Sequence, residues 1–205
     1  MRPLPRLFAF TDASVRGADR IGAHAAELAA LGPAVALVAR DHEASGAELS
    51  DFAGLLLAHC RPAEAALIVS SRPDIAAALG AQGVNLRSSD LPVPDVRRIF
   101  PGWIGRSVHT VYEGGQAVDE GADYLVAGPI YETPSHPGRP VAGIVLLEEL
   151  AQLGPPVIAI GGMTPERARD ARKAGAWGVA AISALWRDRR PGAAAQRFLD
   201  ALIGE

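Results

Sequence analysis

The chain lacks the features that mark several classes of protein. It has one cysteine among 205 residues, Cys60, which excludes an internal disulfide and fits a reducing compartment. No apolar run approaches the length of a membrane span, and the apolar start that ends at Asp12 is too short for a signal peptide. Lysine and arginine number 20 against 23 acidic residues, a net charge of −3, and no basic stripe is present. We therefore expect a cytoplasmic protein that binds neither nucleic acid nor membrane.

Short apolar runs alternate with helical patterns along the chain. The runs are nearly continuous, as expected for parallel strands buried on both faces. Without a linker or a shift in composition, the alternation favours one α/β domain over residues 1–205. Such a chain is predicted to be a (β/α)₈ TIM barrel, the alternative being a flavodoxin-like open sheet, which normally has fewer strands. The predicted strands are residues 7–11, 34–39, 66–70, 83–86, 104–109, 124–130, 157–161 and 178–183.

The sixth predicted strand runs into a polar loop that contains several prolines. Prolines fix φ, so the loop is expected to be stiff. An acid, hydroxyls and an imidazole on a stiff loop at the end of a buried strand predict a reaction site. The alternative is a surface turn whose polar groups face water. The polar side chains of this loop are Tyr131, Glu132, Thr133, Ser135 and His136.

The last two predicted strands end in small or hydroxylic residues that suit an anion. The seventh ends at Gly161 and is followed by Gly162, and the eighth ends at Ile182 and Ser183. A helix with Thr164 as its N-cap is predicted directly after the two glycines. This arrangement indicates a phosphate cradle made by backbone N–H groups, in which a side chain at position 162 would take the place of the anion.

These stretches together resemble the thiamine phosphate synthase / TenI superfamily of (β/α)₈ barrels, from about residue 7 to residue 185. The order and spacing of the motifs match along nearly the whole chain. The resemblance implies that the predicted cradle holds a thiazole phosphate. The matching stretches are residues 37–40, 66–86, 90–92, 104–110, 121–138 and 157–165.

The synthase branch of the superfamily joins a pyrimidine diphosphate to a thiazole phosphate and uses Mg²⁺. Its pattern is Gln-x-Arg-x-Lys on the second strand, Asn-Asp-Arg after the third, Gln-Glu-Asp after the fourth and Thr-x-Thr-Lys after the sixth. Of the charged residues in that pattern, this chain keeps Arg40, Arg72 and Asp90. Two cations and one of two metal carboxylates are lost, which predicts poor neutralisation of a leaving pyrophosphate. The synthase pattern has Gln, Lys, Asp and Lys at the positions where this chain has Val38, His42, Ser71 and His136.

These departures favour the TenI-like branch, whose members shift a proton within a carboxythiazole phosphate tautomer. That reaction needs acid–base groups near a bound phosphate and no metal. One TenI pattern places its catalytic histidine where this chain has Pro129. We therefore expect His136 to carry the proton, with His109 second and Glu132 as a further candidate. The prediction is a thiazole tautomerase, an isomerase without a metal or other cofactor.

Further residues are expected to bind the substrate, a small thiazole phosphate. Arg40 would meet its carboxylate or a second anion, unless it forms an ion pair with Asp41. Ser107, Thr133 and Ser135 are expected to complete the binding set. Two other functions stay open: a Mg²⁺-dependent thiamine phosphate synthase, which is a diphosphorylase and a transferase, and a non-catalytic regulator that binds thiamine phosphates. The sequence leaves a homo-oligomer open.

Overall fold

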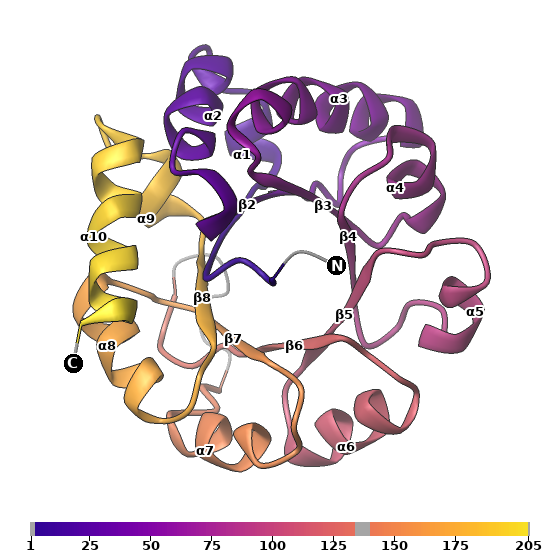
Figure 1. The fold of residues 1–205 in the computed structure, drawn as a ribbon, viewed down its shortest axis with the longest axis vertical. Coiled ribbons are helices and arrows are strands. Elements are labelled where there is room, and N and C mark those ends of the chain that lie inside the picture. The colour runs from indigo at the N-terminus through magenta and orange to yellow at the C-terminus, as the bar shows by residue number, and fades with distance from the viewer. Residues whose placement is uncertain (1–2, 134–139, 205) are drawn as a thin grey trace.

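Eight short strands pair side by side in chain order, and the last pairs with the first. All pairings are parallel, so the C-terminal ends of the strands gather at one rim of this computed structural model, which describes residues 3–133 and 140–204 (Figure 1). The predicted TIM barrel is confirmed. The strands are β1 (Leu7–Phe10), β2 (Val35–Ala39), β3 (Ala66–Ser70), β4 (Gly83–Leu86), β5 (Trp103–Val108), β6 (Tyr124–Ala127), β7 (Val157–Ile160) and β8 (Gly178–Ala181).

Helices surround the barrel, and α10 packs against both α8 and α2 (Figure 1). Within the described part of the chain, no helix is both long enough and apolar enough to cross a membrane. The helical segments are α1 (Ala13–Arg16), α2 (Ile21–Ala29), the 3₁₀ turn η1 (Gly32–Ala34), α3 (Gly46–Ala63), α4 (Pro73–Leu79), α5 (Val93–Arg97), α6 (Val111–Asp119), α7 (Val145–Ala151), α8 (Pro165–Lys173), α9 (Ser183–Trp186) and α10 (Pro191–Ile203).

Helix α8 begins where the sequence predicts. The Thr164 hydroxyl accepts a hydrogen bond from the backbone N–H of Arg167 at 3.3 Å, which caps one of the amides that has no partner inside the helix. Pro165 is the first helical residue, where its missing N–H costs nothing. The cap ends the loop after β7 at a fixed place, and this loop carries the two predicted cradle glycines.

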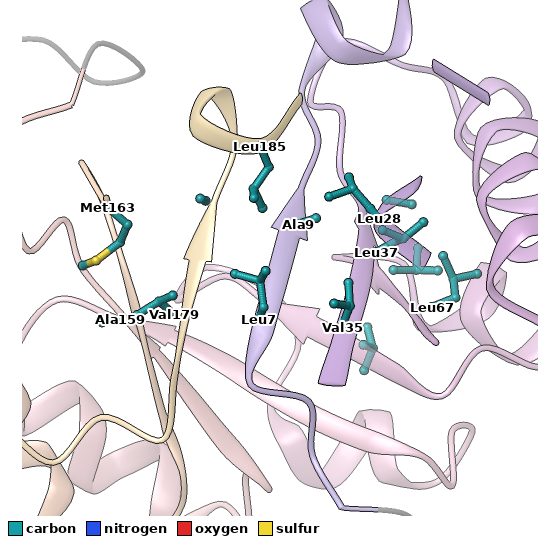
Figure 2. Packing of buried hydrophobic residues seen from close by; sticks show 14 of the residues in the cluster. Leu7, Ala9, Leu28, Val35, Leu37, Leu67, Ala159, Met163, Val179 and Leu185 are labelled. Carbon is teal, nitrogen blue, oxygen red and sulfur yellow. The ribbon is translucent and has the colours of Figure 1, made fainter. Parts of the chain in front are cut away.

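Alternate residues of each strand face opposite sides of the barrel wall, which gives the molecule two apolar cores. Outward residues such as Leu7, Leu37 and Val179 pack with Leu28 of α2 and Leu185 of α9 (Figure 2). Inward residues form a separate cluster that fills the barrel. Its buried members are Phe8, Phe10, Ala36, Val38, Ala66, Ile68, Trp103, Tyr124, Val126, Ile158 and Ala180.

Tyr124 at the start of β6 fills the end of the barrel away from the rim. Its ring is fully buried, lies 5.5 Å from the Phe8 ring centroid, and its hydroxyl donates to the Val84 carbonyl oxygen at 3.2 Å. A Cβ atom on Gly105 would lie 2.1 Å from that ring, so only glycine leaves room for it. Because large apolar side chains fill this end, the described residues leave space for a ligand inside the barrel only toward the opposite rim.

Five predicted strands run one to three residues beyond the observed C-terminal ends. The residues beyond each end belong to loops at the rim. Ile130 illustrates the cause: it is buried and its N–H donates to the Ile160 carbonyl oxygen at 2.9 Å, although β6 ends at Ala127. Apolar character therefore continues past the strand, because the first rim residues still pack against the core.

Candidate active site

A cavity of about 430 Å³ opens at the rim formed by the C-terminal ends of the strands. This volume lies within the range of about 300–1,000 Å³ that is typical of ligand pockets, and the rim is where TIM barrels carry their active sites. The lining residues come from the ends of strands β1 to β8. The polar residues among them are Arg40, His42, Ser70, Asn85, Arg87, Ser88, Ser89, Ser107, His109, Thr133 and Ser183.

Arg40 projects from the end of β2 and is held by Thr11 at the end of β1. Its Nε donates to the Thr11 carbonyl oxygen at 3.0 Å, and its backbone N–H donates to the buried Thr11 hydroxyl at 2.9 Å. Among the described residues, no hydrogen bond occupies its two terminal nitrogens. Burial lowers the pKa of Arg40, which Asp12 and Asp41 oppose, and the guanidinium stays charged. Arg40 can therefore offer two N–H donors to an anion.

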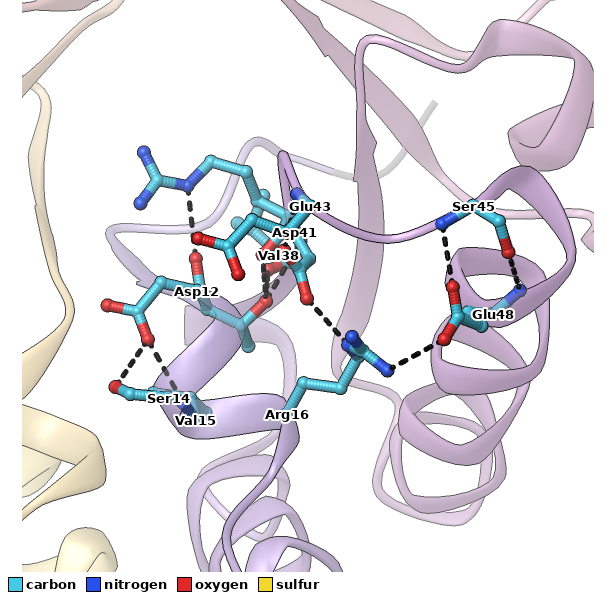
Figure 3. A network of polar contacts seen from close by, with 11 residues as sticks. Asp12, Ser14, Val15, Arg16, Val38, Asp41, Glu43, Ser45 and Glu48 are labelled. Carbon is cyan, nitrogen blue, oxygen red and sulfur yellow. Dashed lines mark hydrogen bonds and ion pairs between the residues drawn. The ribbon is translucent and has the colours of Figure 1, made fainter.

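Asp41 does not form the ion pair with Arg40 that was the alternative to an anion-binding role. Its carboxylate accepts from Arg16 Nε at 2.5 Å and from the Glu43 backbone N–H at 2.9 Å, and Arg16 also reaches Glu48 (Figure 3). Burial alone would raise the pKa of Asp41, but the hydrogen bonds from Arg16 and the backbone lower it. The charge of Arg40 is thus left for the cavity.

Arg87, at the end of β4, is a cavity residue that the sequence analysis missed. Asp90 accepts from the Arg87 backbone N–H at 2.7 Å and from its guanidinium at 3.2 Å. Nearby His42 has a lowered pKa, first because of burial and then because Arg40 and Arg87 lie close to it. The strands β2 to β4 therefore end in a strongly cationic wall.

The cavity floor is polar and comes from inward positions of β3, β4 and β5. Asn85 is 2% exposed, and its Nδ2 donates to the Ser107 hydroxyl at 3.0 Å. Asn85 Oδ1 is buried without a hydrogen-bond partner among the described residues. A buried acceptor without a partner costs free energy unless a ligand or water supplies a donor. Ser107 was predicted, whereas Asn85 was not, although an amide inside the apolar run 83–86 was a signal for it.

His109 lines the cavity at the end of β5, as predicted, and it is exposed. Its Nδ1 contacts the Gly128 carbonyl oxygen, and its backbone N–H donates to the Glu113 carboxylate. A carbonyl oxygen can only accept, so Nδ1 carries the proton and Nε2 is the acceptor in the neutral ring. The imidazole can therefore accept a hydrogen bond from a ligand.

The predicted phosphate cradle lies at the ends of β7 and β8, where all four of its residues line the cavity. Gly161 and Gly162 have φ values of 103° and 61°, which favour glycine. A Cβ on Gly162 would lie 2.4 Å from the Glu132 carbonyl oxygen, so it would strike the loop after β6. Ile182 precedes α9 and supplies no side-chain cap to the first amides of that helix. Ser183 is exposed at the rim.

The polar loop after β6 is only partly described. Thr133 lines the cavity, and Glu132 is exposed and is not among the lining residues. Ser135 and His136 lie outside the described residues, so the prediction that His136 carries the proton has no structural counterpart here. Arg40, Ser107, His109 and the cradle are brought together at one rim. The backbone carbonyl of Glu132 lies beside Gly162, but Glu132 does not line the cavity.

Comparison with known proteins places this geometry in a family. A family model described as thiamine monophosphate synthase matches residues 7–185. A thiamine-phosphate synthase of Methanoculleus marisnigri is 39% identical over 198 residues, which covers 95% of this chain and 93% of the relative. A bifunctional thiamine biosynthesis protein of Symbiobacterium thermophilum is 47% identical over 147 residues, 69% of this chain and 30% of that longer protein. A solved thiamine phosphate pyrophosphorylase from Pyrococcus furiosus is 30% identical, with a TM-score of 0.84 over 96% of this chain and 95% of that one.

These relatives overturn the prediction of a TenI-like thiazole tautomerase, and with it the assignment as an isomerase. The Methanoculleus relative spans nearly the whole chain and is named a synthase, which is a transferase. The physical argument failed because it counted the cations lost at the family positions 42 and 136. It did not count Arg87, which adds a guanidinium to the cavity that Arg40 and His42 line.

Proposed function

The chain belongs to the thiamine monophosphate synthase family, and from this membership we propose that it is a thiamine-phosphate synthase. The proposed reaction joins a pyrimidine diphosphate to a thiazole phosphate. The carbon–oxygen bond to the diphosphate breaks, and a carbon–nitrogen bond to the thiazole ring forms. Pyrophosphate leaves with the electron pair of the broken bond.

The structural observation that supports this proposal is a cavity with two regions whose composition suits anions. One region is the cationic wall with Arg40 and Arg87 at the ends of β2 and β4. The other is the backbone cradle with Gly162 and Ser183 at the ends of β7 and β8. In the closed ring of eight strands, these two groups of strands lie opposite each other. A single phosphate needs one such region, whereas the condensation of two phosphorylated substrates needs both.

We assign the thiazole phosphate to the cradle and the diphosphate to the cationic wall. Backbone N–H groups around Gly161 and at the start of α9 would hold the single phosphate. Arginine forks suit the diphosphate because they bind its oxygens in pairs. The two rings would then meet between these regions, above the Asn85 and Ser107 floor. Holding both reactants in one orientation removes much of the entropic part of the barrier.

The proposed synthase function implies Mg²⁺, and the described residues do not fit a resident divalent ion. They contain no group of three histidine, cysteine or acidic side chains that could hold a metal. Ser71 stands at one position of a metal carboxylate. The retained carboxylate, Asp90, already accepts three hydrogen bonds from Arg87.

Turnover with both substrates tests the proposed function. The purified chain is incubated with pyrimidine diphosphate and thiazole phosphate, with and without Mg²⁺, and thiamine phosphate and pyrophosphate are both quantified. We expect the two products in equal amounts and neither product from one substrate alone. Arg40→Gln removes a charged contact to the leaving group and should lower the rate by about a hundredfold or more.

Arg98→Gln is the matched control for the arginine variant. The Arg98 side chain is 80% exposed, pairs with Asp95, and does not line the cavity. This variant should keep the rate of the unmodified chain. Binding of both substrates without any product would refute the synthase proposal and return the protein to the class of thiamine-phosphate-binding regulators.

A further inference from the structure

The cavity wall formed by the ends of β2 to β4 presents cations and hydroxyls. Arg40, His42 and Arg87 line it together with Ser88 and Ser89, and no described acidic residue lines the cavity. Arg40 and Arg87 both act electrostatically on His42, and all three side chains line the same cavity. A wall of this composition attracts a multiply charged anion.

Two carboxylates lie close behind this wall, and an arginine holds each of them. Asp41 pairs with Arg16 at 2.5 Å, and Asp90 pairs with Arg87 at 3.2 Å. The Asp90 side chain is 12% exposed, whereas that of Arg87 is 50% exposed. The guanidinium of Arg87 therefore covers the Asp90 carboxylate and itself lines the cavity.

The Arg87 guanidinium therefore lies between the Asp90 carboxylate and the cavity, where a divalent ion would have to bind to bridge that carboxylate to a diphosphate. Mg²⁺ in phosphate-handling enzymes bridges one or two protein carboxylates to phosphate oxygens. Here Asp90 is the carboxylate, and its oxygens accept from the backbone N–H, Nε and a terminal nitrogen of Arg87. The same guanidinium can donate to an anion in the cavity, because a guanidinium has five N–H donors.

Resting on the proposed synthase function, we propose that Arg87 replaces the divalent cation of the diphosphate site. The diphosphate binds to Arg40 and Arg87, with the Ser88 and Ser89 hydroxyls beside them, and this binding needs no Mg²⁺. When the carbon–oxygen bond breaks, pyrophosphate takes the electron pair and its new charge is met by the two guanidinium groups.

Binding of inorganic pyrophosphate to the full chain tests this inference without any turnover. Calorimetry is carried out in EDTA and again in Mg²⁺. The unmodified chain should bind pyrophosphate in EDTA. Arg87→Gln should weaken this binding by about ten- to a hundredfold, because it removes a charge-assisted contact. The affinity of Arg87→Lys should lie between those of the unmodified chain and Arg87→Gln. Arg98→Gln should bind like the unmodified chain, and thermal melting checks that each variant is folded.

The Asp90→Asn variant distinguishes an anion site built on Arg87 from one built on a metal ion held by Asp90. If Asp90 serves only to hold Arg87, the variant should bind pyrophosphate within about threefold of the unmodified chain, since no charge contact to the anion is lost. If Asp90 held a metal, this variant would lose Mg²⁺-supported binding. The inference is overturned by that loss, by binding that occurs only with Mg²⁺, or by an Arg87→Gln variant with unchanged affinity.

The inference and the proposed function fail in different ways. Product formation that requires Mg²⁺ and does not change in Arg87→Gln would keep the synthase function and refute the role of Arg87. Pyrophosphate binding in EDTA that depends on Arg87, in a chain that forms no product, would keep the anion site and refute the function.

Discussion

Asn85 is the residue whose surroundings most clearly indicate a contact with a ligand. Its Nδ2 is bonded to Ser107, whereas its buried Oδ1 has no partner among the described residues. A ring with an N–H donor, placed on this floor, would satisfy that oxygen. A site that pairs a buried polar group discriminates strongly against ligands that lack the matching donor.

Asn85→Leu tests this role because it replaces the amide by an apolar side chain of similar size. We expect the affinity for thiamine phosphate, measured by calorimetry, to fall by about tenfold. Thermal stability should stay the same or rise, because a buried oxygen without a partner is removed. A variant that loses stability but keeps its affinity would show that Asn85 serves the core instead.

The lowered pKa of His42 predicts that anion binding depends on pH. Burial and the nearby Arg40 and Arg87 lower its pKa, while Asp41 and Asp90 raise it less, so the free imidazole is mostly neutral at neutral pH. A bound diphosphate favours the protonated form and raises that pKa. The extra affinity is absent above the pKa of the bound state and is fully present below the pKa of the free state.

Pyrophosphate affinity should therefore increase more for the unmodified chain than for His42→Gln when the pH is lowered from about 7.5 to about 5.5. Every group other than His42 is common to the two proteins, and so is pyrophosphate, so the difference between the two pH profiles isolates His42. Parallel profiles would show that His42 does not meet the anion.

The sequence predicts some of these residues and misses others for physical reasons. Arg40 could be predicted because an arginine at a strand end matches a family motif. Arg87 could not, because an arginine three residues before an aspartate is typical of a surface ion pair, and that pair does exist. That Arg87 and Arg40 line the same cavity becomes visible only once the strands are arranged in the closed barrel.

At the scale of elements, the strand ends carry the site, and their loops depend on one another. The loop after β7 packs on the loop after β6, because Tyr131 N–H donates to the Gly161 carbonyl oxygen at 3.2 Å. A Cβ on Gly161 would lie 2.7 Å from Pro129 Cα. The sequence predicts each loop separately and gives no sign that the two are in contact. The contact arises because β6 pairs with β7 in the barrel.

Gly162→Ala should disturb both loops at once. Its φ of 61° disfavours a side chain, and the new Cβ would lie 2.4 Å from the Glu132 carbonyl oxygen. We expect a loss of about 1–3 kcal/mol in the free energy of unfolding and at least about tenfold weaker binding of thiazole phosphate. Urea denaturation and calorimetry measure the two effects.

Gly115→Ala is the matched control for this substitution. Gly115 lies within α6, and a Cβ there would meet nothing within 4 Å. This variant should be about as stable as the unmodified chain or up to about 1 kcal/mol more stable, and its affinity should not change. Equal behaviour of the two variants would refute the role of Gly162 in the cradle.

At the scale of the whole molecule, the closed barrel explains why its apolar residues divide into two cores. The alternation of residues along each strand is visible in the sequence, but a run buried on both faces does not reveal which residues point inward. The structure resolves this: Phe8 and Tyr124 fill the barrel, while Leu7 and Leu125 face the helices. The fold class was therefore predictable, and the packing inside the barrel was not.

Gly105 and Tyr124 test whether this interior is filled as tightly as the geometry indicates. In Gly105→Ala the Cβ would lie 2.1 Å from the Tyr124 ring, and the neighbouring Phe8 ring restricts any shift. We expect a loss of about 1–3 kcal/mol in the free energy of unfolding, measured by urea denaturation. Tyr124→Leu alone should also destabilise the chain by about 2 kcal/mol or more, because it leaves a cavity.

The double variant should be more stable than the sum of the two losses predicts. Removing the ring makes room for the new Cβ at position 105, and that Cβ fills part of the cavity, so the two changes compensate each other. A coupling of about 0.5–3 kcal/mol in this direction is expected for residues in contact. Strictly additive losses would mean that the ring moves aside freely in Gly105→Ala. The end of the barrel away from the rim would then contain unfilled space, and the conclusion that the barrel interior has ligand space only toward the rim would be wrong.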